Sequence, residues 1–301
     1  MPRTVTVGLD GTPESRAAAA WAAREARLRG LPLRILNVWG PAPEPLAEAA
    51  LLGAESWQDW TGRIPREAAE TVRLCHPDVE VVTAQLDGNP ADVLTEEART
   101  AELLVLGSRG FGGINGFMIG SVGLSVIAHA TRPVVLVRAG EQAADEHRPG
   151  PADAASAATP FRPVVLGLDT ADPAAELLEF AFDAATRRRT ALRVAHGWNL
   201  PTSVVYAAAT GYDLSENCAR GEAAALAEAL RPWREKYPDV DVTEECRNGG
   251  AAAVLVSAAQ DASLAVVGRR IRTSPLGAHI GHVTHAALHH ITAPVAVVAH
   301  G

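Results

Sequence analysis

Short apolar runs alternate along the chain with longer segments of helical periodicity. In the first half, the apolar runs that predict strands cover residues 4–10, 32–39, 80–85, 103–107 and 134–138. The segments that predict helices lie between them, at residues 13–29, 54–75, 90–100 and 122–130. The run Leu103-Leu104-Val105-Leu106 shows no alternation, which is typical of a parallel strand covered on both faces. The pattern therefore predicts an α/β fold, in which helices flank a doubly wound sheet of five parallel strands.

The whole pattern occurs twice. Asp10 and Asp169 each follow the first apolar run of a copy, and they are 159 residues apart, as are Trp39 and Trp198. Four further pairs are 161 residues apart, namely Gly88 and Gly249, Gly107 and Gly268, Gly120 and Gly281, and Pro133 and Pro294. A unit of about 140 residues is too long for a solenoid repeat and indicates a duplicated domain. We expect domains at 1–140 and 161–301, joined by an exposed linker at 141–160.

Composition excludes several classes of protein. The formal net charge is −8, so no basic excess is present to neutralise a nucleic-acid backbone. Lys236 is the single lysine, and without a Walker A lysine the chain is not a P-loop NTPase. No apolar run approaches the roughly 20 residues that span a bilayer, so no membrane association is expected. The three cysteines form no C-x-x-C motif and no signal peptide is recognisable, which together favour a cytoplasmic protein.

A glycine-rich segment follows the fourth predicted strand. Gly107 and Gly110 come directly after the strand, and Gly120 and Ser121 open the next predicted helix. Glycine allows the backbone to approach a ligand closely, and a helix N-terminus presents unpaired N–H groups that suit a phosphate. Arg109 offers a charge-assisted hydrogen bond to the same group. Ligands bind at the carboxyl ends of parallel strands, so the segment predicts a phosphate site. The alternative is a mobile glycine loop in which Ser121 caps the helix.

These residues resemble the nucleotide-binding motif of the universal stress protein family. Nucleotide-binding members of that family carry G-x2-G-x9-G-[S/T] after the fourth strand, and Gly107, Gly110, Gly120 and Ser121 match it in full. An aspartate that ends the first strand is also expected, and Asp10 supplies it. The resemblance covers both copies. It implies the tandem form of the family, with an adenine nucleotide α-hydrolase-like fold.

The resemblance implies that ATP, with or without Mg²⁺, lies in the cleft at the strand ends. By analogy, Asp10 and the backbone of Val38 face the adenine and the ribose. The phosphates would be held along the glycine-rich segment, by Gly107, Ser108, Arg109, Gly110, Gly120, Ser121 and Val122. One departure is Gly123, which stands where many members have a second serine or threonine. No catalytic residue and no metal ligand is assigned.

The second copy departs further from the motif. Asp169, Gly268 and Gly281 are retained, whereas Ile271 replaces the second glycine and His282 replaces the serine. A β-branched residue disfavours positive φ and close backbone approach. Arginines at 269, 270 and 272 either compensate as phosphate ligands or are solvated. We expect a weakened nucleotide site in this copy.

Histidines cluster near the last predicted helix, at positions 282, 285, 289 and 290. His285 and His289 have the i,i+4 spacing that suits a metal. However, no nearby carboxylate completes a site, so we interpret them as surface or interface histidines.

The favoured function is therefore a regulatory or protective nucleotide-binding module in the stress response. The first alternative is a slow ATPase or an adenylate-handling α/β hydrolase, although the glycine-rich segment offers no carboxylate for such chemistry. A scaffold that binds no nucleotide is the second alternative. We also expect the two copies to pair through their last strands as an intrachain pseudo-dimer. The sequence leaves open whether two chains also form a homodimer.

Overall fold

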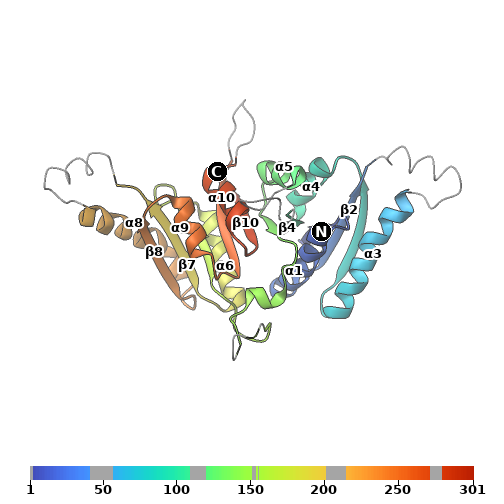
Figure 1. The fold of residues 1–301 in the computed structure, drawn as a ribbon, viewed down its shortest axis with the longest axis horizontal. Coiled ribbons are helices and arrows are strands. Elements are labelled where there is room, and N and C mark those ends of the chain that lie inside the picture. The colour runs from blue at the N-terminus through green and yellow to red at the C-terminus, as the bar shows by residue number, and fades with distance from the viewer. Residues whose placement is uncertain are drawn as a thin grey trace. The chain divides into compact units, whose positions relative to one another are not determined.

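The computed structural model describes residues 3–40, 57–108, 120–150, 154, 156–200, 215–271 and 280–301. The chain divides into two compact units, of which the first ends at Gln142 and the second begins at Ala143. Each unit contains one sheet of five parallel strands with helices on both of its faces (Figure 1). This confirms the predicted α/β fold and its duplication. In the described part of the chain, no helix combines the length and the apolar character needed to cross a membrane.

The first unit has the strand order β3-β2-β1-β4-β5. Its strands are β1 (Val5–Gly8), β2 (Leu33–Trp39), β3 (Val81–Asp87), β4 (Leu103–Gly107) and β5 (Val134–Val137). Its helices are α1 (Pro13–Arg29), α3 (Trp57–Cys75), α4 (Pro90–Thr100) and α5 (Ser121–His129). Helices α1 and α3 cover one face of the sheet, and α4 and α5 cover the other (Figure 1). The order reverses between β1 and β4, which is where a cleft forms in sheets of this kind.

Local sequence signals explain the boundaries of α1. Thr12 caps its N-terminus, because the Thr12 hydroxyl accepts a hydrogen bond from the backbone N–H of Ser15 at 3.2 Å. Pro13 follows in the first turn, where a missing N–H costs nothing. The helix ends at Gly30, whose φ of 62° is the left-handed conformation that glycine adopts without strain. Trp21 on its inner face is fully buried against the sheet.

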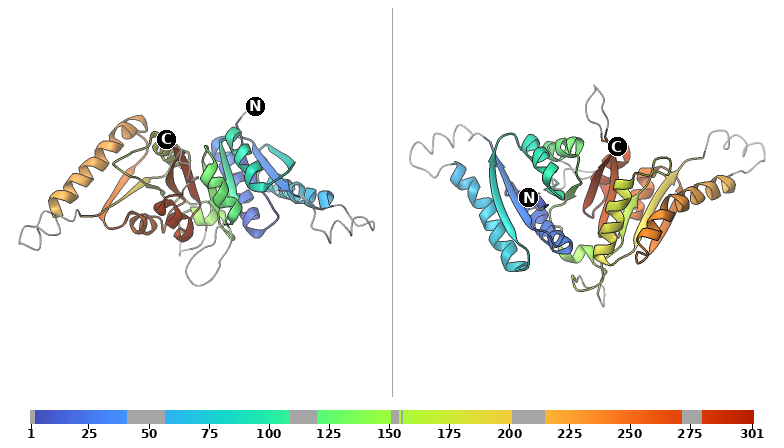
Figure 2. Two further views of the ribbon diagram at one scale, coloured as in Figure 1. Left: turned by 90° about the horizontal axis from the view of Figure 1, so that it is seen from above. Right: turned by 180° about the vertical axis from the view of Figure 1, so that it is seen from behind.

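The second unit repeats this architecture in the order β8-β7-β6-β9-β10. Its strands are β6 (Val164–Gly167), β7 (Leu192–Trp198), β8 (Val242–Asn248), β9 (Leu264–Arg270) and β10 (Val295–His300). Its helices are α6 (Ala175–Arg188), α8 (Ser215–Lys236), α9 (Ala251–Ala258) and α10 (His282–His290) (Figure 2). The pairing register is conserved between the copies. Val5 lies opposite Leu33 in the first unit, and Val164 lies opposite Leu192 in the second.

The segment between the copies differs from the expected exposed linker. Residues 143–146 form a short 3-10 helix, and an antiparallel bridge joins His147 to Phe161. The Glu146 residue is only 2% exposed, and its carboxylate lies 3.9 Å from the guanidinium of Arg188 in α6. The His147 and Phe161 rings are 4.0 Å apart. The expectation of exposure is therefore wrong at Glu146 and His147, because polar side chains here are buried through ion pairing and ring contacts that composition does not reveal.

Candidate functional site

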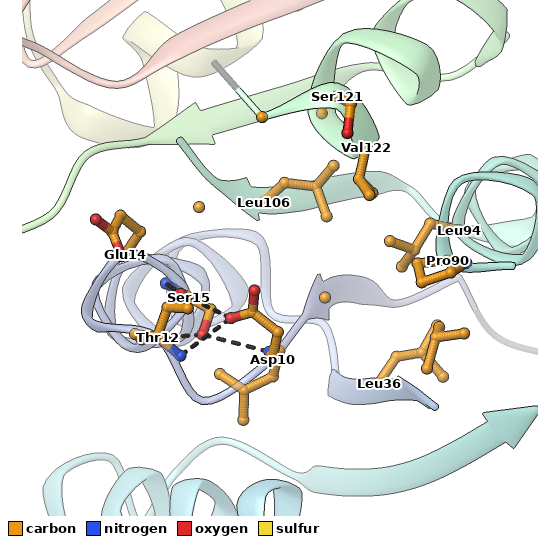
Figure 3. Close-up of a pocket in the computed structure, with 16 residues that line it drawn as sticks. Asp10, Thr12, Glu14, Ser15, Leu36, Pro90, Leu94, Leu106, Ser121 and Val122 are labelled. Atoms are coloured by element: carbon orange, nitrogen blue, oxygen red, sulfur yellow. Dashed lines mark hydrogen bonds between the residues drawn. The ribbon is translucent and has the colours of Figure 1, made fainter. Parts of the chain in front are cut away.

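A cavity of about 710 Å³ opens at the carboxyl ends of β1, β2 and β4 in the first unit. The first turns of α1, α4 and α5 border it (Figure 3). This volume falls within the range of small-ligand sites. Its apolar lining residues are Leu9, Leu36, Val38, Pro90, Leu94, Leu106 and Val122. Its polar lining residues are Asp10, Thr12, Glu14, Ser15 and Ser121, and glycines 8, 107, 120 and 123 complete it.

The cavity is apolar at one end and polar along the other side. Leu36, Pro90 and Leu94 lie together at the apolar end, while the polar side chains of the β1–α1 turn lie away from them (Figure 3). Pro90 is the first residue of α4, and Asn89 caps that helix by accepting a hydrogen bond from the N–H of Ala91 at 2.9 Å. An apolar end of this kind suits the faces of a planar ring, and the polar side suits hydroxyl or anionic groups.

Asp10 lies at the centre of the polar side. Its Oδ1 accepts hydrogen bonds from the Thr12 hydroxyl at 2.6 Å and from the Thr12 backbone N–H at 3.0 Å. Burial raises the pKa of Asp10, but the hydrogen bonds from Thr12 and Ser15 outweigh that effect and leave the pKa below its ordinary value. Asp10 is therefore an ionised acceptor at neutral pH.

The N-terminus of α5 faces the cavity. Gly120 is its N-cap residue and provides no side-chain cap, and the first backbone bond joins the N–H of Leu124 to the Gly120 carbonyl at 3.1 Å. The N–H groups of residues 121–123 therefore have no acceptor within the helix. No acidic residue lies in the first turn, so the positive end of the helix dipole is not neutralised there. Ser121 is exposed at the first helical position and does not cap α5, in contrast to the alternative raised above.

Gly107 has a packing role that sequence reasoning missed. A Cβ atom at this position would lie 2.6 Å from the carbonyl carbon of Glu14 and 2.7 Å from the backbone nitrogen of Ser15. Only a residue without a side chain lets β4 end this close to the first turn of α1. Ser108, the next residue, is buried and is not among the residues that line the cavity. Arg109 and Gly110 lie outside the described residues.

The second unit keeps some of these features and has lost others. Asp169 is retained, and its Oδ1 accepts a hydrogen bond from the N–H of Ala171 at 3.0 Å. Gly281 is the N-cap residue of α10, again without a side-chain cap, and Thr284 in that helix donates its hydroxyl to the Gly268 carbonyl at 2.8 Å. Ile271, which replaces the second glycine of the motif, is 42% exposed.

The apolar end is also different in the second unit. Gly197 in β7 stands at the position of Val38, and a Cβ atom there would lie 2.6 Å from the Cα of Ala251. Ala251 is the first residue of α9. The start of α9 therefore packs directly on β7, in the place where Val38 and Pro90 line the cavity of the first unit.

The structure thus brings together six of the predicted site residues, Asp10, Val38, Gly107, Gly120, Ser121 and Val122. Sequence reasoning missed Thr12, Glu14 and Ser15 on the polar side. The signal that pointed to them was Thr12 before Pro13, a typical start of a helix beside Asp10. The rings of His285 and His289 lie in contact, with centroids 4.3 Å apart and planes tilted by 32°. Across the described residues, no group of three or more His, Cys, Asp or Glu side chains is placed to hold a metal ion.

Comparison with known proteins gives consistent matches. The model of the universal stress protein family matches residues 1–138 and again residues 160–299. A universal stress protein of Mycobacterium tuberculosis H37Rv, Rv2005c, is 33% identical over 97% of this chain and 96% of its own. A crystal structure of a universal stress protein from Archaeoglobus fulgidus covers 99% of this chain and 98% of its own, with 14% identity and a TM-score of 0.67.

A universal stress protein solved in complex with cAMP covers 46% of this chain and 98% of its own, with 27% identity and a TM-score of 0.35. The cAMP is a ligand of that protein. The family model matches both halves of this chain, and relatives align over nearly its full length. The chain therefore belongs to the universal stress protein family, as two family domains in tandem.

Proposed function

We propose that the first unit binds an adenine nucleotide, ATP, and that the bound nucleotide serves a regulatory or protective role in the stress response. The observation that carries the proposal is one continuous cavity with three features. They are an apolar end, an ionised Asp10, and a helix N-terminus with no side-chain cap.

Each part of the nucleotide has a matching surface. The adenine faces would pack on the apolar end, where Leu36, Pro90 and Leu94 lie. Asp10 would accept a hydrogen bond from the ribose or the adenine. The phosphates would bind the free N–H groups at the start of α5 and the Ser121 hydroxyl, because anions are favoured at a helix N-terminus. Arg109 and Gly110 belong to this proposal through the sequence motif alone.

The second unit would bind the same nucleotide weakly or not at all. Two features argue for this. Ile271 and His282 interrupt the phosphate motif, and the approach of Ala251 to Gly197 occupies the counterpart of the apolar end. One tight site per chain is therefore the expected stoichiometry. The three free cysteines suit a reducing compartment, which supports the expected cytoplasmic location.

Slow ATP hydrolysis is the second candidate function, and Glu14 is the observation that favours it. Glu14 lines the same cavity from the first turn of α1, so a carboxylate is present where the glycine-rich segment supplies none. Hydrolysis needs a residue that orients the attacking water near the γ-phosphate, usually together with Mg²⁺. Mg²⁺ enters the proposal only as the usual companion of ATP.

The experiment that tests the proposal is to denature the purified chain and separate any released nucleotide by chromatography. The proposal is supported if ATP is released, or if the nucleotide-free chain binds added ATP. A chain that releases no nucleotide and shows no stabilisation by millimolar ATP in a denaturant titration contradicts it. At 100 times its Kd, ATP would raise the free energy of unfolding by about 2.7 kcal/mol.

A further inference from the structure

We propose that Thr12 is a positioning residue for the nucleotide site, whose hydroxyl holds the Asp10 carboxylate so that one oxygen is offered to the ligand. This inference rests on the proposed function, and it names the residue that orients the Asp10 carboxylate for nucleotide binding. Thr12 lies outside the glycine motif, two residues after Asp10 in the turn between β1 and α1.

The geometry places both Thr12 donors on the same oxygen. Its hydroxyl and its backbone N–H each donate to Asp10 Oδ1, at 2.6 Å and 3.0 Å. The Thr12 hydroxyl oxygen also accepts from the N–H of Ser15 at 3.2 Å, which fixes the direction in which its hydrogen points. Ser15 closes the turn, because its hydroxyl donates to the Thr12 carbonyl at 3.0 Å.

One carboxylate oxygen of Asp10 is left for a ligand. Both hydrogen bonds from Thr12 end on Oδ1, and none is drawn to Oδ2 from the other residues that line the cavity (Figure 3). Asp10 lines the cavity, so an acceptor with a fixed orientation is available there before the ligand arrives. Pre-organised groups of this kind raise affinity by lowering the ordering cost of binding.

The second unit shows the turn without this hydroxyl. Ala171 stands at the position of Thr12, and among the described residues the Asp169 carboxylate accepts one hydrogen bond, from the backbone N–H of Ala171. Ala174 is the N-cap residue of α6, and no side chain caps that helix. The aspartate is thus retained in both copies, but its orienting hydroxyl is present in the first copy alone. This difference lies in the turn between β6 and α6, in a different part of the sequence from the interrupted glycine motif.

A role in capping α1 alone would explain the same hydrogen bond to Ser15, so the test must separate capping from orientation. Thr12→Ala removes the hydroxyl, and Thr12→Ser keeps both its donor and its acceptor. Asn89→Ala is the matched control, because it removes the N-cap of α4, another helix that borders the cavity. Loss of either cap should destabilise the chain to a similar extent.

The experiment measures two quantities on the full chain, the Kd for ATP by calorimetry and the pKa of Asp10 by carboxyl ¹³C NMR without nucleotide. Thr12→Ala should raise the pKa of Asp10 and weaken ATP binding about tenfold, as expected for one hydrogen bond to a charged group. Thr12→Ser should restore both values. Asn89→Ala should leave the pKa of Asp10 unchanged.

Three results would overturn the inference. The first is a Thr12→Ala chain that binds ATP within twofold of the wild type, and the second is one in which the pKa of Asp10 does not move. The third is an Asn89→Ala chain in which the pKa of Asp10 rises as much as it does in Thr12→Ala. If the wild-type chain binds no ATP, the proposed function is wrong, and this inference falls with it. That outcome differs from the three above, in which the wild type binds ATP.

Discussion

A Cβ atom on Gly107 would lie 2.7 Å from the backbone nitrogen of Ser15, closer than side chains approach backbone atoms. The first glycine of the nucleotide motif is therefore required by the packing of β4 on α1, before any ligand is considered. Ser15 also closes the hydrogen-bonded turn that contains Asp10. This packing couples the end of β4 to the orientation of the polar side of the cleft.

We expect Gly107→Ala to destabilise the chain by about 1–3 kcal/mol, because α1 must move to admit the methyl group. Urea denaturation gives the difference in the free energy of unfolding. Gly221→Ala is the matched control, since Gly221 lies within α8 and no atom of the described residues comes within 4 Å of its Cβ position. That change should leave stability unchanged or raise it by up to about 1 kcal/mol. A Gly107→Ala chain as stable as the wild type would refute the packing role.

Gly120→Val should abolish ATP binding while the fold is retained. The φ of Gly120 is −66°, which valine tolerates, so the change adds bulk beside the N–H groups of α5 without backbone strain. Gly281→Val makes the same change at the N-cap of α10, where φ is −62° and no atom of a described residue lies within 4 Å of the Cβ position. Calorimetry should show no ATP binding for the first variant and wild-type affinity for the second. Unchanged affinity in a folded Gly120→Val chain would contradict the phosphate assignment.

Glu14→Gln separates binding from hydrolysis. If the chain hydrolyses ATP, this variant should lower the rate of ADP production and keep the affinity for ATP, because an amide is a poor general base. The rate is measured under multiple-turnover conditions with ATP and Mg²⁺. Glu14→Gln with an undiminished rate would exclude Glu14 from the chemistry. ADP in no more than stoichiometric amounts from the wild type would argue against an enzyme.

Pairing of the two units through their last strands stays a prediction. If it occurs, the outward backbone amides of β5 and β10 exchange with deuterium as slowly as those of the central strands β1 and β6. Amide exchange on the full chain measures this directly. Rapid exchange along the outer edges of both β5 and β10 would rule out the intrachain pseudo-dimer.

The sequence was informative wherever a local physical rule decided the structure. The bounds of α1, α4 and β4 agree with the predicted ranges, because caps, prolines and continuous apolar runs mark them. Asp10, Gly120 and Ser121 were placed in one cleft because parallel strands bring their carboxyl ends to one edge.

Other features depend on tertiary contacts that no local pattern encodes. The burial of Glu146 depends on Arg188, which is 42 positions later in the chain. The packing role of Gly107 depends on where α1 begins, and the approach of Gly197 to Ala251 depends on how α9 sits on β7. Glu14 was missed as a cavity residue because its place depends on how the first turn of α1 packs against the end of β4.

The most direct test of the central claim is a calorimetric titration of nucleotide-free wild-type chain with ATP, which reports both affinity and stoichiometry. The account predicts one tight site per chain, lost in Gly120→Val and retained in Gly281→Val. The absence of binding to the wild type, or two tight sites of equal affinity, would contradict it.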